Sequence, residues 1–167
     1  SGTIGGITNG PITMLGWVKL NSEISSGEYE IFQHQNGTNY VEYYIRYQYN
    51  SGTRRLVFSR NRAGVSNDNF SYNIALGTSL WHQLAITYDG TTLRGYINGI
   101  SVGSAAASGS GSSGLTNYFA LGGNSVVSTW LSGLLDDVAI FDRALSDDEV
   151  KASYSGGADI RFSTDST

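Results

Sequence analysis

The sequence of 167 residues contains no cysteine, a single proline and no long apolar run. Without cysteine the chain cannot form disulfides, so its hydrophobic core alone has to hold the fold. This absence favours a bacterial or phage protein over a small animal extracellular domain. No apolar stretch approaches the roughly 20 residues that a membrane-spanning helix needs, and we therefore expect no membrane insertion.

Charged side chains are also scarce, at 14% of the chain, and the net charge is −4 with a pI of about 5.0. A domain that binds nucleic acid usually carries a basic stripe, so we expect no nucleic-acid partner. The one basic cluster comprises Arg54, Arg55, Arg60 and Arg62. We interpret these arginines as solvated strand ends and loop, and a site for a sulfated or uronic-acid sugar is the alternative.

Glycine and tyrosine are plentiful instead, with 22 and 11 copies, beside 40% hydrophobic residues. Apolar and polar residues alternate with a period of two from Ile12 to Phe141, which is typical of half-buried strands. Asp89-Gly90 and Asn98-Gly99 are hairpin signals. The predicted strands are 12–20, 28–35, 40–50, 55–60, 82–89, 93–98, 101–102, 118–122 and 134–141, with a small polar loop over 103–114.

One helix is predicted, over residues 147–154. Ser146 is suited to cap it, Glu149 completes a capping box, and Leu145 with Val150 forms a hydrophobic staple. Many short strands and one short helix indicate an all-β fold, a two-sheet antiparallel β-sandwich. We expect residues 1–157 to form this one domain and residues 158–167 to be a polar, linker-like tail.

Three stretches resemble the laminin G-like family of the concanavalin A-like lectin/glucanase superfamily. They are WHQLAITYDGTTLRGYING at 81–99, GLLDDVAIFDRALSDDEV at 133–150, and the strand at 12–19 that ends in Trp-Val-Lys. The first is similar to the signature hairpin of the family, and the second to its last strand and capped helix. The resemblance implies a jelly-roll sandwich of the concanavalin A type over nearly the whole chain.

The resemblance also bears on calcium, through Asp136. Asp136 shares the alternation of Val138 and Ile140, whose side chains should point between the sheets. A carboxylate there needs amide donors or a hard cation. Related sandwich proteins often use an Asp at this place, which implies a structural Ca²⁺ ligand. The alternative is that Asp136 caps turn amides without metal, and Asp137 should face outward.

Catalytic motifs are missing. Glycan-cleaving enzymes on related sandwiches carry carboxylates spaced as Glu-x-Asp-x-x-Glu on one strand, and the sequence has no such triplet. Glu28 and Glu30 are the nearest pair, in what we expect to be a turn-rich approach to a strand. His82, one of two histidines, belongs to the family hairpin and is interpreted as structural. The chain is therefore predicted not to be an enzyme.

Ligand binding is predicted on the tyrosine-rich strand 40–50. If Tyr43, Ile45 and Tyr47 face the core, the neighbouring positions line the other surface. The predicted binding residues are Tyr40, Glu42, Tyr44, Arg46 and Gln48, joined by Trp17 and Tyr96, which have the same outward parity on their own strands. Alternatively the tyrosines only cover an open sheet face, or rim loops at 67–69 and 125–129 bind. Trp81 and Trp130 are expected in the core.

The sequence thus predicts a non-catalytic, lectin-like carbohydrate-binding module. Its partner would be a glycan or glycoprotein, bound by aromatic stacking and polar contacts. We expect a monomeric module of a larger secreted or cell-surface protein. The first alternative is a protein-interaction or structural adhesion module, and a glycan-cleaving enzyme is the second.

Overall fold

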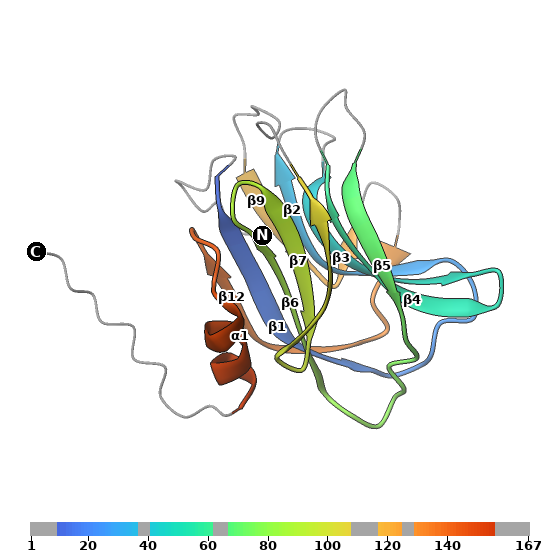
Figure 1. Cartoon of the computed structure of the whole chain (residues 1–167). Helices are drawn as coiled ribbons and strands as arrows, with labels where there is room; N and C mark the ends of the chain where they lie inside the picture. Colours follow the sequence, from blue (N-terminus) through green and yellow to red (C-terminus); the bar gives the residue numbers. More distant parts are fainter. Residues whose placement is uncertain (1–9, 37–40, 62–66, 108–116, 125–128, 156–167) are drawn as a thin grey trace, which may run out of the picture.

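A computed structural model describes residues 10–36, 41–61, 67–107, 117–124 and 129–155. Two five-stranded antiparallel sheets face each other, and one helix lies against the outside of one of them (Figure 1). The predicted two-sheet β-sandwich with a short C-terminal helix is confirmed. The predicted tail at 158–167 lies outside the described residues.

Sheet 1 carries the helix and has the strand order β12-β1-β6-β7-β8. Sheet 2 has the order β5-β4-β3-β2-β9. The strands of sheet 1 are β1 (Ile12–Leu20), β6 (His82–Tyr88), β7 (Thr92–Ile97), β8 (Ile100–Ala106) and β12 (Gly133–Phe141). Those of sheet 2 are β2 (Glu28–Asn36), β3 (Val41–Asn50), β4 (Thr53–Arg60), β5 (Asp68–Asn73) and β9 (Asn117–Leu121). A separate short pair is formed by β10 (Gly123–Asn124) and β11 (Thr129–Trp130).

The predicted strands all occur, with ends shifted by a few residues. β5 was not predicted: Asp68 and Asn69, considered for a rim loop, lie on this strand, which pairs with β4. Residues 103–106, predicted as loop, extend β8. The apolar pattern is weak in both segments, which lie at sheet edges: residues 103–106 have small side chains, and most residues of β5 are exposed.

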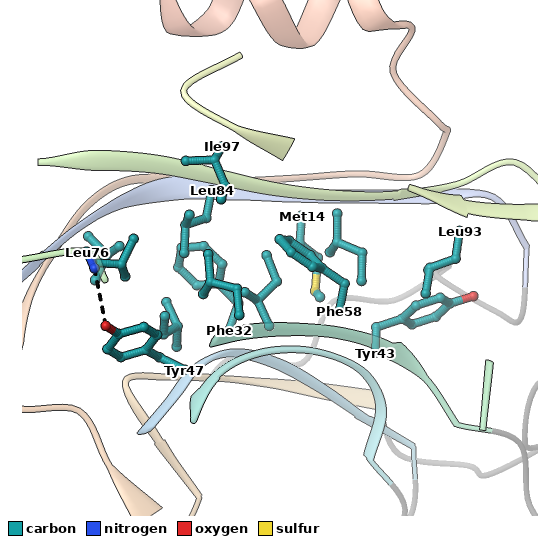
Figure 2. Close-up of a cluster of buried hydrophobic side chains, with 14 of the residues drawn as sticks. Met14, Phe32, Tyr43, Tyr47, Phe58, Leu76, Leu84, Leu93 and Ile97 are labelled. Carbon is teal, nitrogen blue, oxygen red and sulfur yellow. Dashed lines mark hydrogen bonds between the residues drawn. The ribbon is translucent and has the colours of Figure 1, made fainter. Parts of the chain in front are cut away.

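The core fills the space between the sheets. Tyr43, Ile45 and Tyr47 of β3 point into it, as predicted, and are at most 1% exposed. The Tyr47 hydroxyl remains satisfied there: it donates to Glu23 Oε2 (2.7 Å) and accepts from the Leu76 amide (3.2 Å; Figure 2). The tyrosines of this strand thus divide between the core and the outer face of sheet 2 according to the period of two.

Two facing glycines allow the sheets to approach. Gly95 of β7 and Gly103 of β8 are paired in register. A Cβ at Gly95 would lie 2.6 Å from the ring of Phe58, and one at Gly103 would lie 2.7 Å from the ring of Phe70. The two rings stack on each other with centroids 5.1 Å apart. The glycines therefore provide the room that this aromatic pair occupies.

Helix α1 (Asp147–Tyr154) has the predicted bounds and the predicted capping box. The Glu149 amide donates to Ser146 Oγ (3.3 Å), and the Ser146 amide donates to Glu149 Oε2 (2.8 Å). Leu145 and Val150 pack with Leu15, Ala85 and Tyr96 in a second apolar cluster on the outside of sheet 1. This cluster attaches the helix to the sheet.

A β-bulge interrupts β12. Leu15 pairs with Ala139 and Trp17 with Asp136, so two steps along β1 correspond to three along β12. Asp137 has φ = 45°, in the left-handed region. The bulge changes the side to which the following residues point, and Asp136 is exposed beside Trp17. The prediction that Asp136 points between the sheets is therefore wrong, because it assumed an uninterrupted strand.

Candidate functional site

The candidate site is the outer face of sheet 2, where polar side chains of three adjacent strands lie side by side. The register places Glu28 of β2, Gln48 of β3 and Arg55 of β4 in one row. Glu30 of β2 and Arg46 of β3 form the next row. Directly opposed residues on neighbouring strands share a face, so these five side chains form one surface, which we call the polar face.

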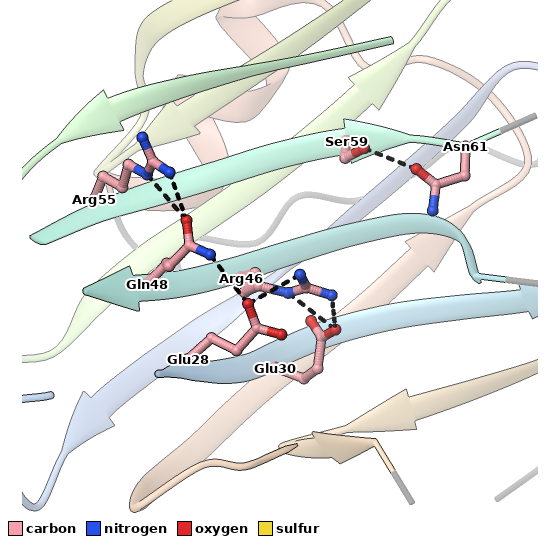
Figure 3. Close-up of polar contacts among 7 residues, drawn as sticks. All are labelled: Glu28, Glu30, Arg46, Gln48, Arg55, Ser59 and Asn61. Atoms are coloured by element: carbon pink, nitrogen blue, oxygen red, sulfur yellow. Dashed lines mark hydrogen bonds and ion pairs between the residues drawn. The ribbon is translucent and has the colours of Figure 1, made fainter. Parts of the chain in front are cut away.

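Arg46 is the centre of the polar face. Its Nε and Nη2 donate to Glu30 Oε1 (3.1 and 2.6 Å), and its Nη1 donates to Glu28 Oε2 (3.0 Å; Figure 3). The Glu30 side chain is 1% exposed, whereas those of Arg46 and Glu28 are 20% and 21% exposed. Burial alone would lower the pKa of Arg46, but the hydrogen bond and charge of Glu30 outweigh it and raise that pKa. The guanidinium is therefore held charged and fixed in place.

The hydrogen bonds continue from Glu28 across the sheet. Gln48 Nε2 donates to Glu28 Oε2 (3.2 Å), and Gln48 Oε1 accepts from Nε and Nη2 of Arg55 (3.0 and 2.7 Å; Figure 3). Both Gln48 and Arg55 are partly exposed. The polar face thus presents donors and acceptors that already hold each other in position.

Tyr44 lies on this side of the sheet, as its parity predicts, but it does not offer a free ring. Only 7% of the residue is exposed, and the Arg46 guanidinium lies 4.5 Å from the ring centroid. The geometry therefore supports polar contacts here rather than the expected stacking of a sugar on Tyr44. Of the other residues predicted on this strand, Tyr40 and the side chain of Glu42 lie outside the described part of the structure.

Trp17 and Tyr96 do not join the polar face, so that prediction is wrong. Both belong to sheet 1, whose outer surface is on the opposite side of the sandwich. Tyr96 is 1% exposed, and its hydroxyl donates to Asp147 of the helix (2.7 Å). Burial and the Asp147 carboxylate raise the pKa of Tyr96 to about 12. Equal parity on two strands cannot show which of two sheets each strand joins.

The basic cluster is not a solvated patch as a whole. Arg60 is fully buried, with Nη1 3.3 Å from Asp68 Oδ2 and its guanidinium 4.2 Å from the centroid of the Tyr88 ring. Arg54 binds the Ile24 carbonyl and Glu23, and Arg55 belongs to the polar face. The expectation of solvated strand ends is wrong for Arg60, because its partner Asp68 comes from the unpredicted strand β5. Arg62 lies outside the described residues.

Two tryptophans expected in the core are exposed. Trp81 is 36% and Trp130 60% exposed, which contradicts that prediction. Trp81 comes directly before β6, and together with Trp17, Asp136 and Asp137 it lines an open pocket of about 250 Å³ on sheet 1. Within the described ranges no group of three or more His, Cys, Asp or Glu side chains is assembled for a metal ion. Asp136 Oδ1 accepts from the Asp137 amide (2.9 Å), which is the turn-capping alternative.

Glu28 and Glu30 lie on strand β2, within the predicted strand 28–35, and not in a turn-rich approach to it. Both carboxylates bind the same guanidinium, and Glu30 is almost fully buried. An acid and a base that act on a glycosidic bond must both reach the substrate. The predicted structural role of His82 is supported, since its Nε2 lies 2.7 Å from the Leu76 carbonyl oxygen.

The two sheets, their register and the capped helix define a concanavalin A-like β-sandwich. Residues 2–151 match a laminin G-like family model described as the concanavalin A-like lectin/glucanases superfamily. The chain belongs to this family, as its sequence motifs indicated. No curated protein sequence matches it. None of the described helical segments is long and apolar enough to cross a bilayer.

Solved structures share the fold at low sequence identity. A heptameric SAP-like pentraxin from Limulus polyphemus has a TM-score of 0.68 at 19% identity, over 89% of this chain and 70% of that one. The binding domain of botulinum neurotoxin DC in complex with SialylT has a TM-score of 0.65 at 16% identity, over 87% and 35% of the two chains. A botulinum neurotoxin type C structure, described in terms of cell entry through two ganglioside molecules, has a TM-score of 0.65 at 17% identity. The chain spans 35% of that toxin chain too.

Proposed function

We propose that the chain is a non-catalytic carbohydrate-binding module that binds glycan on the polar face. The observation that carries this proposal is the chain of hydrogen bonds linking Glu30, Arg46, Glu28, Gln48 and Arg55. It holds partly exposed donors and acceptors in fixed positions on a sheet. Groups fixed before binding lose less conformational entropy when a ligand arrives, so they favour recognition of hydroxyl-rich molecules.

Arg55 provides a partly exposed donor for such a ligand. Its Nε and Nη2 point to Gln48, whereas Nη1 donates to no described residue. On the other side of the row, Glu28 can accept from sugar hydroxyls because its side chain is 21% exposed. Vicinal hydroxyls could bridge these groups, because a hydroxyl can accept from Arg55 and donate to Glu28, whereas the carboxylate of an acidic sugar could bind only Arg55. An acidic sugar would favour the guanidinium end through a charge-assisted, bidentate contact.

The comparisons support the class of ligand without identifying it. One toxin structure is described as a binding domain in complex with SialylT, and the other in terms of cell entry that depends on two ganglioside molecules. The superfamily description covers both lectins and glucanases. The burial of Glu30 and the engagement of both carboxylates by Arg46 support the non-catalytic alternative. As expected from the sequence, we propose a module of a larger secreted or cell-surface protein.

A glycan array tests the proposal, with the purified chain and the variants Gln48→Ala and Arg55→Ala. Both positions are partly exposed, so the variants should fold. We expect binding to at least one glycan class and a loss of about tenfold in affinity for each variant, since one polar contact is worth about 1 kcal/mol or more. Arg94→Ala, which removes an arginine from sheet 1, is the charge-matched control and should bind normally. Silence across neutral and acidic glycans would favour a protein-interaction or adhesion module.

Calcium at Asp136 remains a prediction of the family resemblance, and the same array tests it. The screen is run with calcium and again with EDTA, and thermal unfolding is followed in both buffers. A bound structural ion should raise the unfolding temperature, because a ligand that binds only the folded state stabilises it. Asp136→Asn should remove this shift. Identical curves with and without EDTA would contradict the prediction and favour the turn-capping role.

A further inference from the structure

We propose that the pocket lined by Trp17, Trp81, Asp136 and Asp137 is a second binding site, specific for a sugar that carries a free, protonated amino group. We call it the tryptophan–aspartate pocket. It lies on the outside of sheet 1, whereas the polar face lies on the outside of sheet 2. The choice of a sugar rests on the proposed glycan-binding function, but the two sites can be tested separately.

The backbone brings both carboxylates to one place. Successive residues of a regular strand point to opposite faces, so two adjacent aspartates would normally be separated by the sheet. Here the bulge in β12 intervenes, with Asp137 at φ = 45°, and both residues line the same pocket. Bulges commonly re-aim side chains beside functional sites. The paired acidic groups are thus a product of the local backbone and not of composition alone.

The two carboxylates have no cationic partner. Among the described residues neither Asp136 nor Asp137 forms an ion pair, although Lys19 lies two residues from Trp17 on β1. Among the described residues, the one hydrogen bond that either side chain makes runs from the Asp137 amide to Asp136 Oδ1. Two uncompensated negative charges beside a pocket attract a cation, and they are also good acceptors for hydroxyl groups.

The tryptophans supply flat apolar walls. The Trp17 indole stacks on Tyr154 of the helix, with centroids 5.6 Å apart and planes 28° apart. This contact fixes the ring before any ligand arrives. Trp81 is 36% exposed, which is unusual for a residue of its size. Indole faces bind both the C–H face of a sugar ring and a cation, the latter worth about 0.5–2 kcal/mol.

The volume limits the ligand. The pocket holds about 250 Å³, below the roughly 300–1,000 Å³ of sites for drug-sized molecules, so it suits one sugar ring. A neutral sugar would contact the tryptophan walls but would not neutralise the two carboxylate charges. An amino sugar places its ammonium between indole faces and carboxylates while its ring lies against tryptophan. The geometry therefore points to glycans that contain unacetylated glucosamine-type units.

Calorimetric titration tests this with two matched probes, a glucosamine oligomer and an N-acetylglucosamine oligomer of the same length. The titrations use physiological salt with EDTA, so that calcium cannot occupy Asp136, and a mildly acidic pH, where the amine is charged. We expect the glucosamine oligomer to bind at least tenfold more tightly. Trp81→Ala should abolish binding, and the double variant Asp136→Asn/Asp137→Asn should remove the preference for the amine. Asn tolerates the backbone of residue 137, so the bulge should persist.

Matched controls separate the pocket from general effects. Trp130→Ala removes another exposed tryptophan, and Asp142→Asn/Asp148→Asn removes two exposed charges elsewhere, so both should bind as the unaltered chain does. Gln48→Ala and Arg55→Ala should also leave this binding intact, which distinguishes failure here from failure at the polar face. Equal affinity for both oligomers, or no binding of either, would overturn the proposal. Equally tight binding of an oligolysine peptide through the same residues would also overturn the proposal, because the pocket would then recognise the ammonium group alone.

Discussion

Arg46 illustrates how one side chain can serve both stability and binding. Its guanidinium binds Glu30, which is 1% exposed, and Glu28, which reaches solvent. The buried carboxylate needs a cation, whereas the exposed one remains accessible to a ligand. For this reason Arg46 is a poor choice for a binding test and a good one for a stability test.

Replacing Arg46 with Ala should destabilise the chain by about 2–4 kcal/mol. The change removes the cation from a buried carboxylate, and breaking such a pair from one side is costly. Urea unfolding measures the loss. Arg94→Ala provides the comparison, because its pair with Asp89 is exposed and screened by solvent and should be worth less than about 1 kcal/mol. Similar losses for the two variants would show that Glu30 does not depend on Arg46.

At the scale of single residues, alternation in the sequence predicted well on which face of a strand a side chain lies. It predicted poorly which other side chains that residue contacts. The alternation in β3 placed Tyr43, Ile45 and Tyr47 in the core correctly. It could not reveal that Arg46 would cover Tyr44, since this depends on a neighbouring strand that carries two glutamates. Arg60 was misjudged for the same reason, because its partner lies on a strand with little apolar alternation. The parity of Arg46 and Gln48 was a signal for the polar face, and the i, i+2 spacing of Glu28 and Glu30 was a second one.

At the scale of elements, local signals were decisive for the helix. Ser146 and Glu149 defined its start to the residue, because a capping box is made entirely of near neighbours in sequence. The bulge in β12 left no comparable signal. Aspartate tolerates a left-handed backbone but does not require it, so the Asp136-Asp137 pair looked like ordinary alternation. The error at Asp136 follows directly from this.

The helix cap should also respond to acid. The hydrogen bond from Arg143 and the bond from the Ser146 amide lower the pKa of Glu149 from the ordinary 4.5 to about 2. A lowered pKa in the folded state stabilises the fold above the ordinary pKa, and the contribution is lost as pH falls from about 4.5 to about 2. Glu149→Gln should therefore be less stable than the parent at neutral pH, with the difference shrinking over that window. Denaturant midpoints measured from pH 6 downward, at roughly half-unit steps, test this expectation; a constant difference would contradict it.

At the scale of the whole molecule, the sandwich depends on how closely its sheets approach. Gly95 and Gly103 of sheet 1 face the stacked rings of Phe58 and Phe70 of sheet 2. The sequence-level family resemblance predicted the two-sheet fold, but the strand pattern alone does not say which glycines lie between the sheets. Only the register of both sheets brings these four residues together.

Gly95→Ala should destabilise the fold by about 1–3 kcal/mol. The added methyl group would lie 2.6 Å from the Phe58 ring, and overpacking of this kind forces side chains out of position. Thermal or urea unfolding measures the effect. Ser104→Ala, at an exposed position of the neighbouring strand, should change stability by less than about 0.5 kcal/mol. Combining Gly95→Ala with Phe58→Leu should recover part of the loss, and strictly additive losses would contradict the steric explanation.

The bulge in β12 also affects how readily two copies of the chain can pair along their sheet edges. β12 ends its sheet on one side among the described residues, so the backbone groups along its outer side lack a neighbouring strand. A straight strand in that position is a template on which a second chain can add by strand pairing. The left-handed residue Asp137 breaks the regular spacing of those groups and places a charge among them. The irregularity that brings two aspartates to one pocket thereby also makes this sheet edge a poorer template for pairing with a second chain.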